Sequence, residues 1–235
     1  MDAQQMKVAA AREALSDVTS GMKLGLGTGS TASELVRLLG DALKQRTLRD
    51  LRCTSTSEQT AELARSVGIE ILPLASVAPL DLAIDGADEI DAQLRLIKGR
   101  GGALLREKIV EQQAKRFIVI ADESKIVEKL GLGPLPVEVT PFAREVLERR
   151  FVEMGLAPVL RMRDGKPRVT DEQHLILDIS VPKNQDIAEV VTKIRELAGV
   201  IDTGFFPNEA TEAIIAGSNG VRRMKKNRQP VTGNR

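Results

Sequence analysis

The sequence is poor in aromatic residues, cysteine and histidine, and each shortage excludes a kind of chemistry. Five phenylalanines are its only aromatic residues, so platforms for stacking nucleic-acid bases are not expected. A single cysteine, Cys53, excludes an internal disulfide, and a single histidine, His174, makes the usual histidine-based triads improbable. We therefore predict no metal site and no other cofactor. Cys53 is expected to be a small buried hydrophobic residue and not a nucleophile.

Charge is balanced along most of the chain and shifts at its end. The 235 residues include 34 Lys and Arg and 33 Asp and Glu, but residues 222–235 hold six basic residues and no acidic one. We predict a solvated, disordered tail there, in preference to a nucleic-acid-binding arm, because no aromatic residue interleaves with the charges. No apolar run reaches the roughly 20 residues that cross a membrane. Residues 1–19 match neither a signal nor a transit peptide, so a cytoplasmic protein is expected.

A glycine-rich loop follows the first expected strand. Residues 22–26 have the pattern of a short strand, residues 25–31 read Gly-Leu-Gly-Thr-Gly-Ser-Thr, and residues 32–44 have helical periodicity. A helix N-terminus after such a loop offers unpaired N–H groups to an anion. The loop lacks the lysine of a Walker motif and the spacing of a dinucleotide fingerprint, which disfavours nucleotides. We predict a small phosphorylated ligand, with a purely structural turn as the alternative. The residues expected to contact the anion are Thr28, Gly29, Ser30 and Thr31.

A cluster of acidic residues follows another buried strand. Residues 80–84 are mostly apolar, and residues 85–91 read Asp-Gly-Ala-Asp-Glu-Ile-Asp. The spacing lacks the pattern of a calcium-binding loop, so these acids are expected to transfer protons or to bind hydroxyl groups. Glu89 and Asp91 are expected only to form the turn. The residues expected to lie along the ligand are Asp85, Gly86, Ala87 and Asp88.

The stretch from Lys98 to Ile109 combines a lysine, three glycines and a helical glutamate. Lys98 is expected at the end of a strand, and Gly99, Gly101 and Gly102 would let the backbone turn tightly and approach a ligand. In helical register Glu107 shares a face with apolar residues, whereas Arg106 and Lys108 are expected to point outward. Burial would raise the pKa of Glu107, which suits a general base. An ordinary helical glutamate paired with a surface cation is the alternative.

Polar or charged clusters follow four expected strands. They occupy residues 28–31, 85–88, 98–101 and 122–125, and Lys125 closes the last of them. In an open α/β sheet such strand ends line one crevice. Their convergence is the strongest physical argument for a single site.

The expected elements divide the chain into two domains. Residues 1–130 and 206–221 are expected to form a Rossmann-like, open and mostly parallel sheet with helices on both faces, including a strand at 69–72. Residues 131–205 show the order strand, helix, strand, strand, helix, strand, which is typical of a smaller ferredoxin-like α+β domain. Residues 212–221 are expected to return to the first domain as its last strand.

Taken together, the motifs at 25–31, 85–90, 98–103 and 106–109, with Pro134-Leu-Pro-Val-Glu-Val139 beyond them, closely resemble ribose-5-phosphate isomerase type A. The resemblance spans residues 5–221 and implies an aldose–ketose isomerase of the non-oxidative pentose phosphate pathway. Such an enzyme interconverts D-ribose 5-phosphate and D-ribulose 5-phosphate without a metal. The resemblance implies that Glu107 moves a proton between C2 and C1 and that Lys7 reaches the phosphate. It also implies a homodimer or homotetramer.

For this chemistry Lys98 would be the cation beside the enediolate, and Asp85 and Asp88 would hold sugar hydroxyls and assist ring opening. Two places depart from the family pattern. Arg100 stands where glycine is more usual, and would either contact the phosphate or line the rim of the site. Residues 208–212 also differ, which leaves contacts near the last strand open.

Two relatives of the same fold are the alternative interpretations. A sugar-phosphate-sensing module would carry a helix-turn-helix, for which there is no room before Met22. A coenzyme-A transferase would use a glutamate as nucleophile and need a larger chain. Turnover of ribose 5-phosphate separates the three functions.

Overall fold

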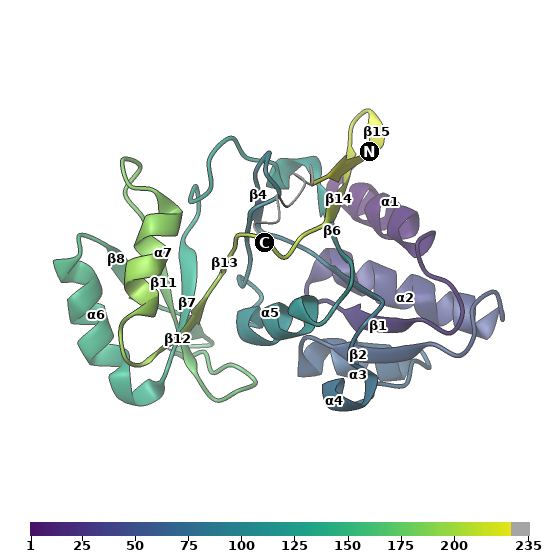
Figure 1. Cartoon of the computed structure of the whole chain (residues 1–235), viewed down its shortest axis with the longest axis horizontal. Helices are drawn as coiled ribbons and strands as arrows, with labels where there is room; N and C mark the ends of the chain where they lie inside the picture. Colours follow the sequence, from purple (N-terminus) through teal and green to yellow (C-terminus); the bar gives the residue numbers. More distant parts are fainter. Residues whose placement is uncertain (227–235) are drawn as a thin grey trace, which may run out of the picture.

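The computed structural model describes residues 1–226, and its larger part, on the right in Figure 1, is built on a six-stranded sheet. The strand order is β15-β14-β6-β3-β1-β2, and every neighbouring pair is parallel except the hairpin of β14 and β15. Its inner strands are short runs of buried residues, as expected when both faces of a parallel sheet are covered. The strands are β1 (Lys23–Leu26), β2 (Arg52–Ser55), β3 (Leu82–Asp85), β6 (Phe117–Asp122), β14 (Glu212–Gly217) and β15 (Gly220–Lys225).

Helices cover both faces of this sheet. α1 (Ala3–Leu15) and α2 (Ser30–Lys44) pack on one face, where their apolar residues meet Leu24 and Leu26 of β1. Side chains alternate along a strand, so Gly25 faces the other way, against Val110 of α5 (Leu104–Gln112). α3 (Glu58–Ser66) and the short α4 (Leu74–Val77) contact β2. The predicted α/β architecture is thus confirmed.

A second, four-stranded antiparallel sheet has its own hydrophobic core. Its order β12-β7-β11-β8, with helices between the first and second and between the third and fourth strands in sequence, is the predicted ferredoxin-like arrangement. Its elements are β7 (Leu135–Val139), α6 (Arg144–Glu153), β8 (Ala157–Leu160), β11 (Leu175–Ser180), α7 (Ile187–Arg195) and β12 (Val200–Thr203), with β9 (Met162–Arg163) and β10 (Lys166–Pro167) forming a small hairpin.

A small three-stranded sheet that the sequence did not predict connects the two larger ones. It consists of β4 (Glu89–Ile90), β5 (Leu96–Ile97) and β13 (Phe205–Phe206). Leu96 packs in the core beneath the six-stranded sheet, and its neighbour Ile97 packs in the core of the ferredoxin-like domain. β5 therefore joins both cores, and Lys98 follows it directly.

Two expectations about strands were wrong. Residues 69–72 form no strand of their own, and only an isolated bridge joins Ile71 to Cys53. Residues 222–225, assigned to a disordered tail, belong to β15, which pairs with β14 along its whole length. The Arg223 guanidinium attaches this strand to the rest of the domain through ion pairs with Glu13, Asp17 and Glu212. The remainder of the predicted tail, 227–235, lies outside the described residues.

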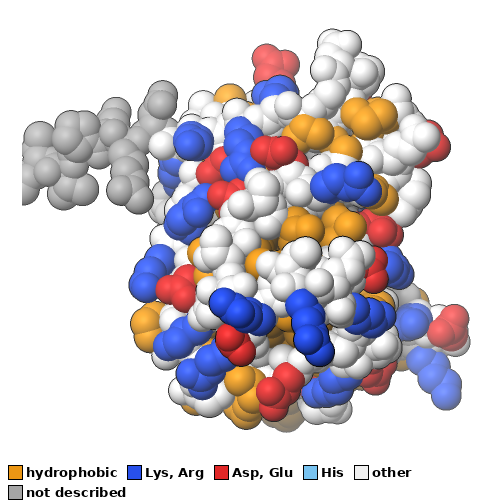
Figure 2. All heavy atoms as spheres, turned by 90° about the vertical axis from the view of Figure 1, so that its right-hand side faces the viewer, with side chains coloured by type: hydrophobic (Ala, Val, Ile, Leu, Met, Phe, Trp, Pro, Cys, Tyr) orange, Lys and Arg blue, Asp and Glu red, His pale blue; other side chains and the backbone are white. Residues whose placement is uncertain are grey.

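Figure 2 shows the face formed by the six-stranded sheet and its helices, where Lys and Arg side chains are interspersed with Asp, Glu and apolar groups. Basic side chains form no continuous stripe on this face. No helix between residues 1 and 226 is long and apolar enough to span a bilayer.

Candidate active site

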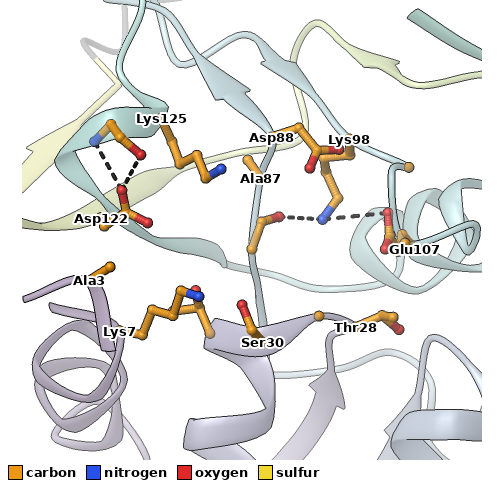
Figure 3. Close-up of a pocket in the computed structure, with 16 residues that line it drawn as sticks. Ala3, Lys7, Thr28, Ser30, Ala87, Asp88, Lys98, Glu107, Asp122 and Lys125 are labelled. Atoms are coloured by element: carbon orange, nitrogen blue, oxygen red, sulfur yellow. Dashed lines mark hydrogen bonds and ion pairs between the residues drawn. The ribbon is translucent and has the colours of Figure 1, made fainter. Parts of the chain in front are cut away.

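A cavity of about 360 Å³ opens where the predicted strand ends meet. All four clusters, at 28–31, 85–88, 98–101 and 122–125, contribute to its wall, as the sequence predicted. Of the predicted site residues, only Asp85 and Arg100 do not line it. The lining residues are Ala3, Lys7, Thr28, Gly29, Ser30, Thr31, Gly86, Ala87, Asp88, Lys98, Gly99, Gly101, Glu107, Asp122, Ser124 and Lys125 (Figure 3).

One end of the cavity combines a helix N-terminus with two lysines. Gly29, with φ 110°, precedes the first turn of α2, and no side chain caps that turn. Its N–H groups and the Ser30 hydroxyl therefore remain for a ligand. Lys7 of α1 and Lys125 of the 3₁₀ turn η1 (Glu123–Lys125) extend toward the same space (Figure 3), and neither has an ion-pair partner among residues 1–226. Unpaired cations at a helix N-terminus suit a phosphate.

The other end contains one ammonium group shared by three carboxylates. The Lys98 Nζ lies 2.9 Å from Asp85 Oδ2, 3.1 Å from Glu111 Oε1 and 3.7 Å from Glu107 Oε2. Its hydrogen bond goes to the carbonyl oxygen of Gly86, at 2.6 Å. Lys98 is only 2% exposed, so it is fixed in place beside Glu107.

Burial and mutual charge shift the protonation of this cluster. Burial raises the pKa of Glu107 to about 8, although the neighbouring Lys98 opposes the shift. The pKa of Glu111 is also raised, mainly by burial. Burial alone would lower the pKa of Lys98, but the three carboxylates outweigh it and hold that pKa above its usual range. Lys98 is therefore charged, and a carboxyl whose pKa lies near neutrality faces the cavity, as a general base requires.

Asp85 lies behind the wall of the cavity. Its Oδ1 accepts hydrogen bonds from the backbone N–H of Thr28 (2.9 Å) and of Gly86 (2.6 Å). A side chain at Gly27 would collide with this carboxylate, which explains the glycine there. Asp85 thus joins two loops of the site to Lys98. Its burial contradicts the expectation that it contacts the sugar directly. Asp88 faces the cavity and accepts the N–H of Arg100 at 2.9 Å.

Arg100 was expected to line the substrate, but its side chain turns away from the cavity. The guanidinium lies 3.3 Å from Glu89 Oε1. Glu89 is buried and also accepts N–H groups of Gly131 and Gly133, at 2.7 and 2.6 Å. This carboxylate fixes the direction of the Arg100 side chain. Glu89, expected only to form a turn, therefore also connects Arg100 to the segment at 131–133.

The sequence did not predict the surroundings of Glu111, Lys108 and the Thr28 hydroxyl. Glu111 lies one turn after Glu107 on the same face of α5, a spacing that could have revealed it. Lys108, expected to point outward, is buried and donates to Asp202 Oδ1 and to the Thr203 carbonyl, at 2.9 and 2.7 Å. The Thr28 hydroxyl, expected to face the anion, instead joins a hydroxyl network formed by Thr56, Ser57 and Thr60.

The lone cysteine and histidine lie outside the cavity. Cys53 is fully buried, as predicted, and burial raises the pKa of its thiol to about 12. His174 Nδ1 contacts Glu138 at 3.0 Å in the ferredoxin-like domain. Over the described range 1–226, no group of three His, Cys, Asp or Glu side chains is arranged to hold a metal ion.

Comparison with known proteins identifies the family of this chain. The family model for ribose 5-phosphate isomerase A (phosphoriboisomerase A) matches residues 52–220. The ribose-5-phosphate isomerase A of Agrobacterium fabrum is 47% identical over 231 residues, which cover 96% of this chain and 99% of that one. The chain belongs to the ribose-5-phosphate isomerase A family.

Solved structures of this family share the whole fold. A D-ribose-5-phosphate isomerase in complex with phospho-erythronic acid superposes with a TM-score of 0.92 at 38% identity, covering 96% of this chain and all of that one. The Plasmodium falciparum enzyme gives 0.92 at 36% identity, with the same coverage of the two chains. The predicted enzyme class is thereby confirmed: the chain is an aldose–ketose isomerase that interconverts D-ribose 5-phosphate and D-ribulose 5-phosphate.

Proposed function

We propose that Glu107 is the base of this isomerisation. Its carboxylate would take the proton from C2 of the open-chain aldose, and the electrons of that C–H bond would form the C1–C2 double bond of an enediolate. Glu107 would then return the proton to C1, which yields the ketose. One observation carries this assignment: Glu107 is 3% exposed, yet lines the cavity 3.7 Å from a buried ammonium group.

We assign the remaining chemistry to Lys98 and Asp88. As C2 loses its proton, negative charge develops on the oxygen of C1, and the Lys98 ammonium is already fixed nearby to stabilise it. The hydroxyl proton on O2 must also move to O1. Asp88 lines the cavity and has one oxygen occupied by the Arg100 N–H, so its other oxygen is placed to carry that proton.

The phosphate is assigned to the opposite end of the cavity. The N-terminus of α2 with Ser30 and Thr31, together with Lys7 and Lys125, would bind it. Because the phosphate does not change during the reaction, these contacts hold substrate and transition state alike. Asp85 is assigned a positioning role, since it holds Lys98 and the two loops on either side.

Glu107→Gln tests the central assignment, with Glu62→Gln on the exposed face of α3 as the matched control. The variant keeps the size of the side chain but removes the base, so turnover should fall by roughly 10²- to 10⁴-fold. Affinity for substrate should change little. In D₂O, the control should exchange solvent deuterium into the substrate at the carbon that loses its proton, and the variant should not. Wild-type turnover and exchange in Glu107→Gln would transfer the role of the base to Asp88.

The predicted homodimer or homotetramer and the cytoplasmic location remain proposals that rest on the family. Light scattering of the purified chain at micromolar concentration tests the first. Fractionation of the producing cell, followed by an activity assay of each fraction, tests the second.

A further inference from the structure

Three consecutive carbonyl groups of the loop at 99–101 face the ferredoxin-like domain and accept hydrogen bonds from two of its arginines. The Arg161 Nη1 donates to the carbonyl oxygens of Gly99 and Arg100, at 2.6 and 3.1 Å. The Arg168 Nη2 donates to the carbonyl oxygen of Gly101. Neither arginine lines the cavity, but Gly99 and Gly101 do.

Arg161 is itself held rigidly. Its Nε and Nη2 donate to the two oxygens of Asp178 on β11, in the bidentate arrangement that suits a guanidinium. Its backbone N–H donates to the Ile176 carbonyl at 2.9 Å, and its own carbonyl accepts the N–H of Arg168. The Arg161 side chain is 11% exposed, so the sheet of the ferredoxin-like domain fixes the direction of Nη1, the nitrogen that does not contact Asp178.

The direction of these carbonyls decides where the loop's N–H groups point. In a trans peptide, the C=O of one residue and the N–H of the next point in opposite directions. Turning the Gly99 carbonyl toward Arg161 therefore turns the Arg100 N–H toward Asp88, which accepts it at 2.9 Å. Turning the Arg100 carbonyl the same way directs the Gly101 N–H away from the small domain. Within residues 1–226 that N–H has no hydrogen-bond partner, so it is available to an oxygen of the substrate.

The same loop sets the start of the helix that carries Glu107. Gly99 and Gly102 have φ of 99° and 79°, and the Gly102 N–H closes a turn on the Gly99 carbonyl. A side chain at Gly102 would meet the Arg168 guanidinium. α5 begins two residues later with no side-chain cap, and Glu107 lies in its first turn. A shift of the loop would consequently move Asp88 and Glu107 relative to each other.

We propose that Arg161 and Arg168 are positioning residues of the small domain that hold the loop's peptide groups in the orientation required for proton transfer. Asp178 acts through Arg161. This inference rests on the proposed roles of Glu107 and Asp88 and adds a function for the ferredoxin-like domain. A group misplaced by about 1 Å can cost roughly 100-fold in rate, so the contribution is expected in kcat.

The test uses the full-length enzyme with Arg161→Gln, Arg161→Lys, Asp178→Asn and Arg168→Gln. Arg163→Gln is the matched control, since Arg163 lies two residues away on β9 with its side chain 72% exposed. We expect Arg161→Gln to lower kcat roughly 10- to 100-fold while KM changes less than about 3-fold. Arg161→Lys keeps the charge but not the fork and should lose nearly as much. Millimolar guanidinium ion should restore part of the kcat of Arg161→Gln and do nothing for the control.

Turnover of Arg161→Gln equal to that of Arg163→Gln would overturn the inference. A loss explained entirely by a smaller folded fraction, without guanidinium rescue, would do the same. If Arg161→Gln does not fold, Arg168→Gln and Asp178→Asn decide the question by the same split between kcat and KM. Glu107→Gln measured alongside separates the two proposals: if it is inactive while the arginine variants keep full kcat, only the positioning role fails.

Discussion

Glu107→Gln should make the enzyme lose less stability than the wild type as the pH rises, although it lowers turnover roughly 10²- to 10⁴-fold. The native carboxyl has a pKa of about 8, raised from an ordinary 4.5, mainly by burial. Between these two values the folded chain holds a proton that the unfolded chain has released. The free energy of unfolding therefore falls as pH rises, by at most about 1.4 kcal/mol per pH unit. The contribution of the neutral carboxyl is complete below pH 4.5 and is lost as the pH passes through 8.

Glutamine cannot ionise, so the variant is free of this loss. From pH 6 to pH 8 the wild type should lose at most about 2 to 3 kcal/mol that the variant keeps. For a chain of this size each kcal/mol corresponds to about 2 to 4 °C in Tm. The difference in Tm between variant and wild type should thus grow by of order 5 °C across that range. Glu111, whose pKa is also raised, is present in both proteins and largely cancels.

Thermal unfolding followed by circular dichroism, at pH steps from 5.5 to 8.5 and constant ionic strength, measures this difference. Glu62→Gln, on an exposed part of α3, should show no trend with pH. A difference in Tm that stays constant from pH 6 to pH 8 would refute the reasoning, because Glu107 would then titrate like a solvated carboxyl. In that case burial would not prepare it as a base.

Three further outcomes are expected. Below the Glu107 pKa of about 8, kcat/KM for D-ribose 5-phosphate should fall about tenfold per pH unit; a flat profile between pH 6 and 8 would contradict that pKa. Lys98→Ala should lower kcat more than it raises KM, and it should also destabilise the fold because it leaves buried carboxylates without their cation. Ser30→Ala should chiefly raise KM, and equal effects of both variants on KM alone would refute these roles. Arg223→Ala should cost about 1 to 3 kcal/mol of unfolding free energy, seen as a lower Tm near pH 7. The cost should be smaller in acid: burial alone would raise the pKa of Asp17, but the guanidinium groups of Arg223 and Arg116 lower it, and this stabilisation is lost as the pH falls through that pKa. An unchanged Tm would mean that β15 does not depend on Arg223.

The architecture could be predicted because its signals are local. Periodicity, glycine loops and the order of elements predicted the mostly parallel sheet and the ferredoxin-like strand order, and parallel strands necessarily bring their ends to one edge. Even the inward direction of Glu107 followed from helical register, since the face it shares with Val110 is buried. These features need no knowledge of what lies across the molecule.

The errors concern residues whose surroundings come from distant parts of the chain. Lys108 looked like a surface residue, but the small domain covers that side of α5 and supplies Asp202, 94 residues away. Arg223 looked like part of a solvated tail, but Glu13, 210 residues upstream, is one of its partners. Arg100 was assigned to the site from its neighbours in sequence, whereas Glu89 decides where it points. A charged side chain near a site is placed by its partner, and the partner cannot be read from local pattern.

In the proposed mechanism the two ends of the cavity would use their cations in different ways. Lys7 and Lys125 have no ion-pair partner within residues 1–226, so under the proposed assignment their full charge would attract a phosphate that enters and leaves unchanged. Lys98 is surrounded by acids, so it offers little extra attraction to a substrate in its ground state. In the proposed mechanism, however, Glu107 would take the proton from C2, so its own charge would be neutralised and the enediolate would become the anion beside Lys98. Lys98 would thus interact most strongly with the substrate when charge develops there, so its effect is expected in kcat and not in KM.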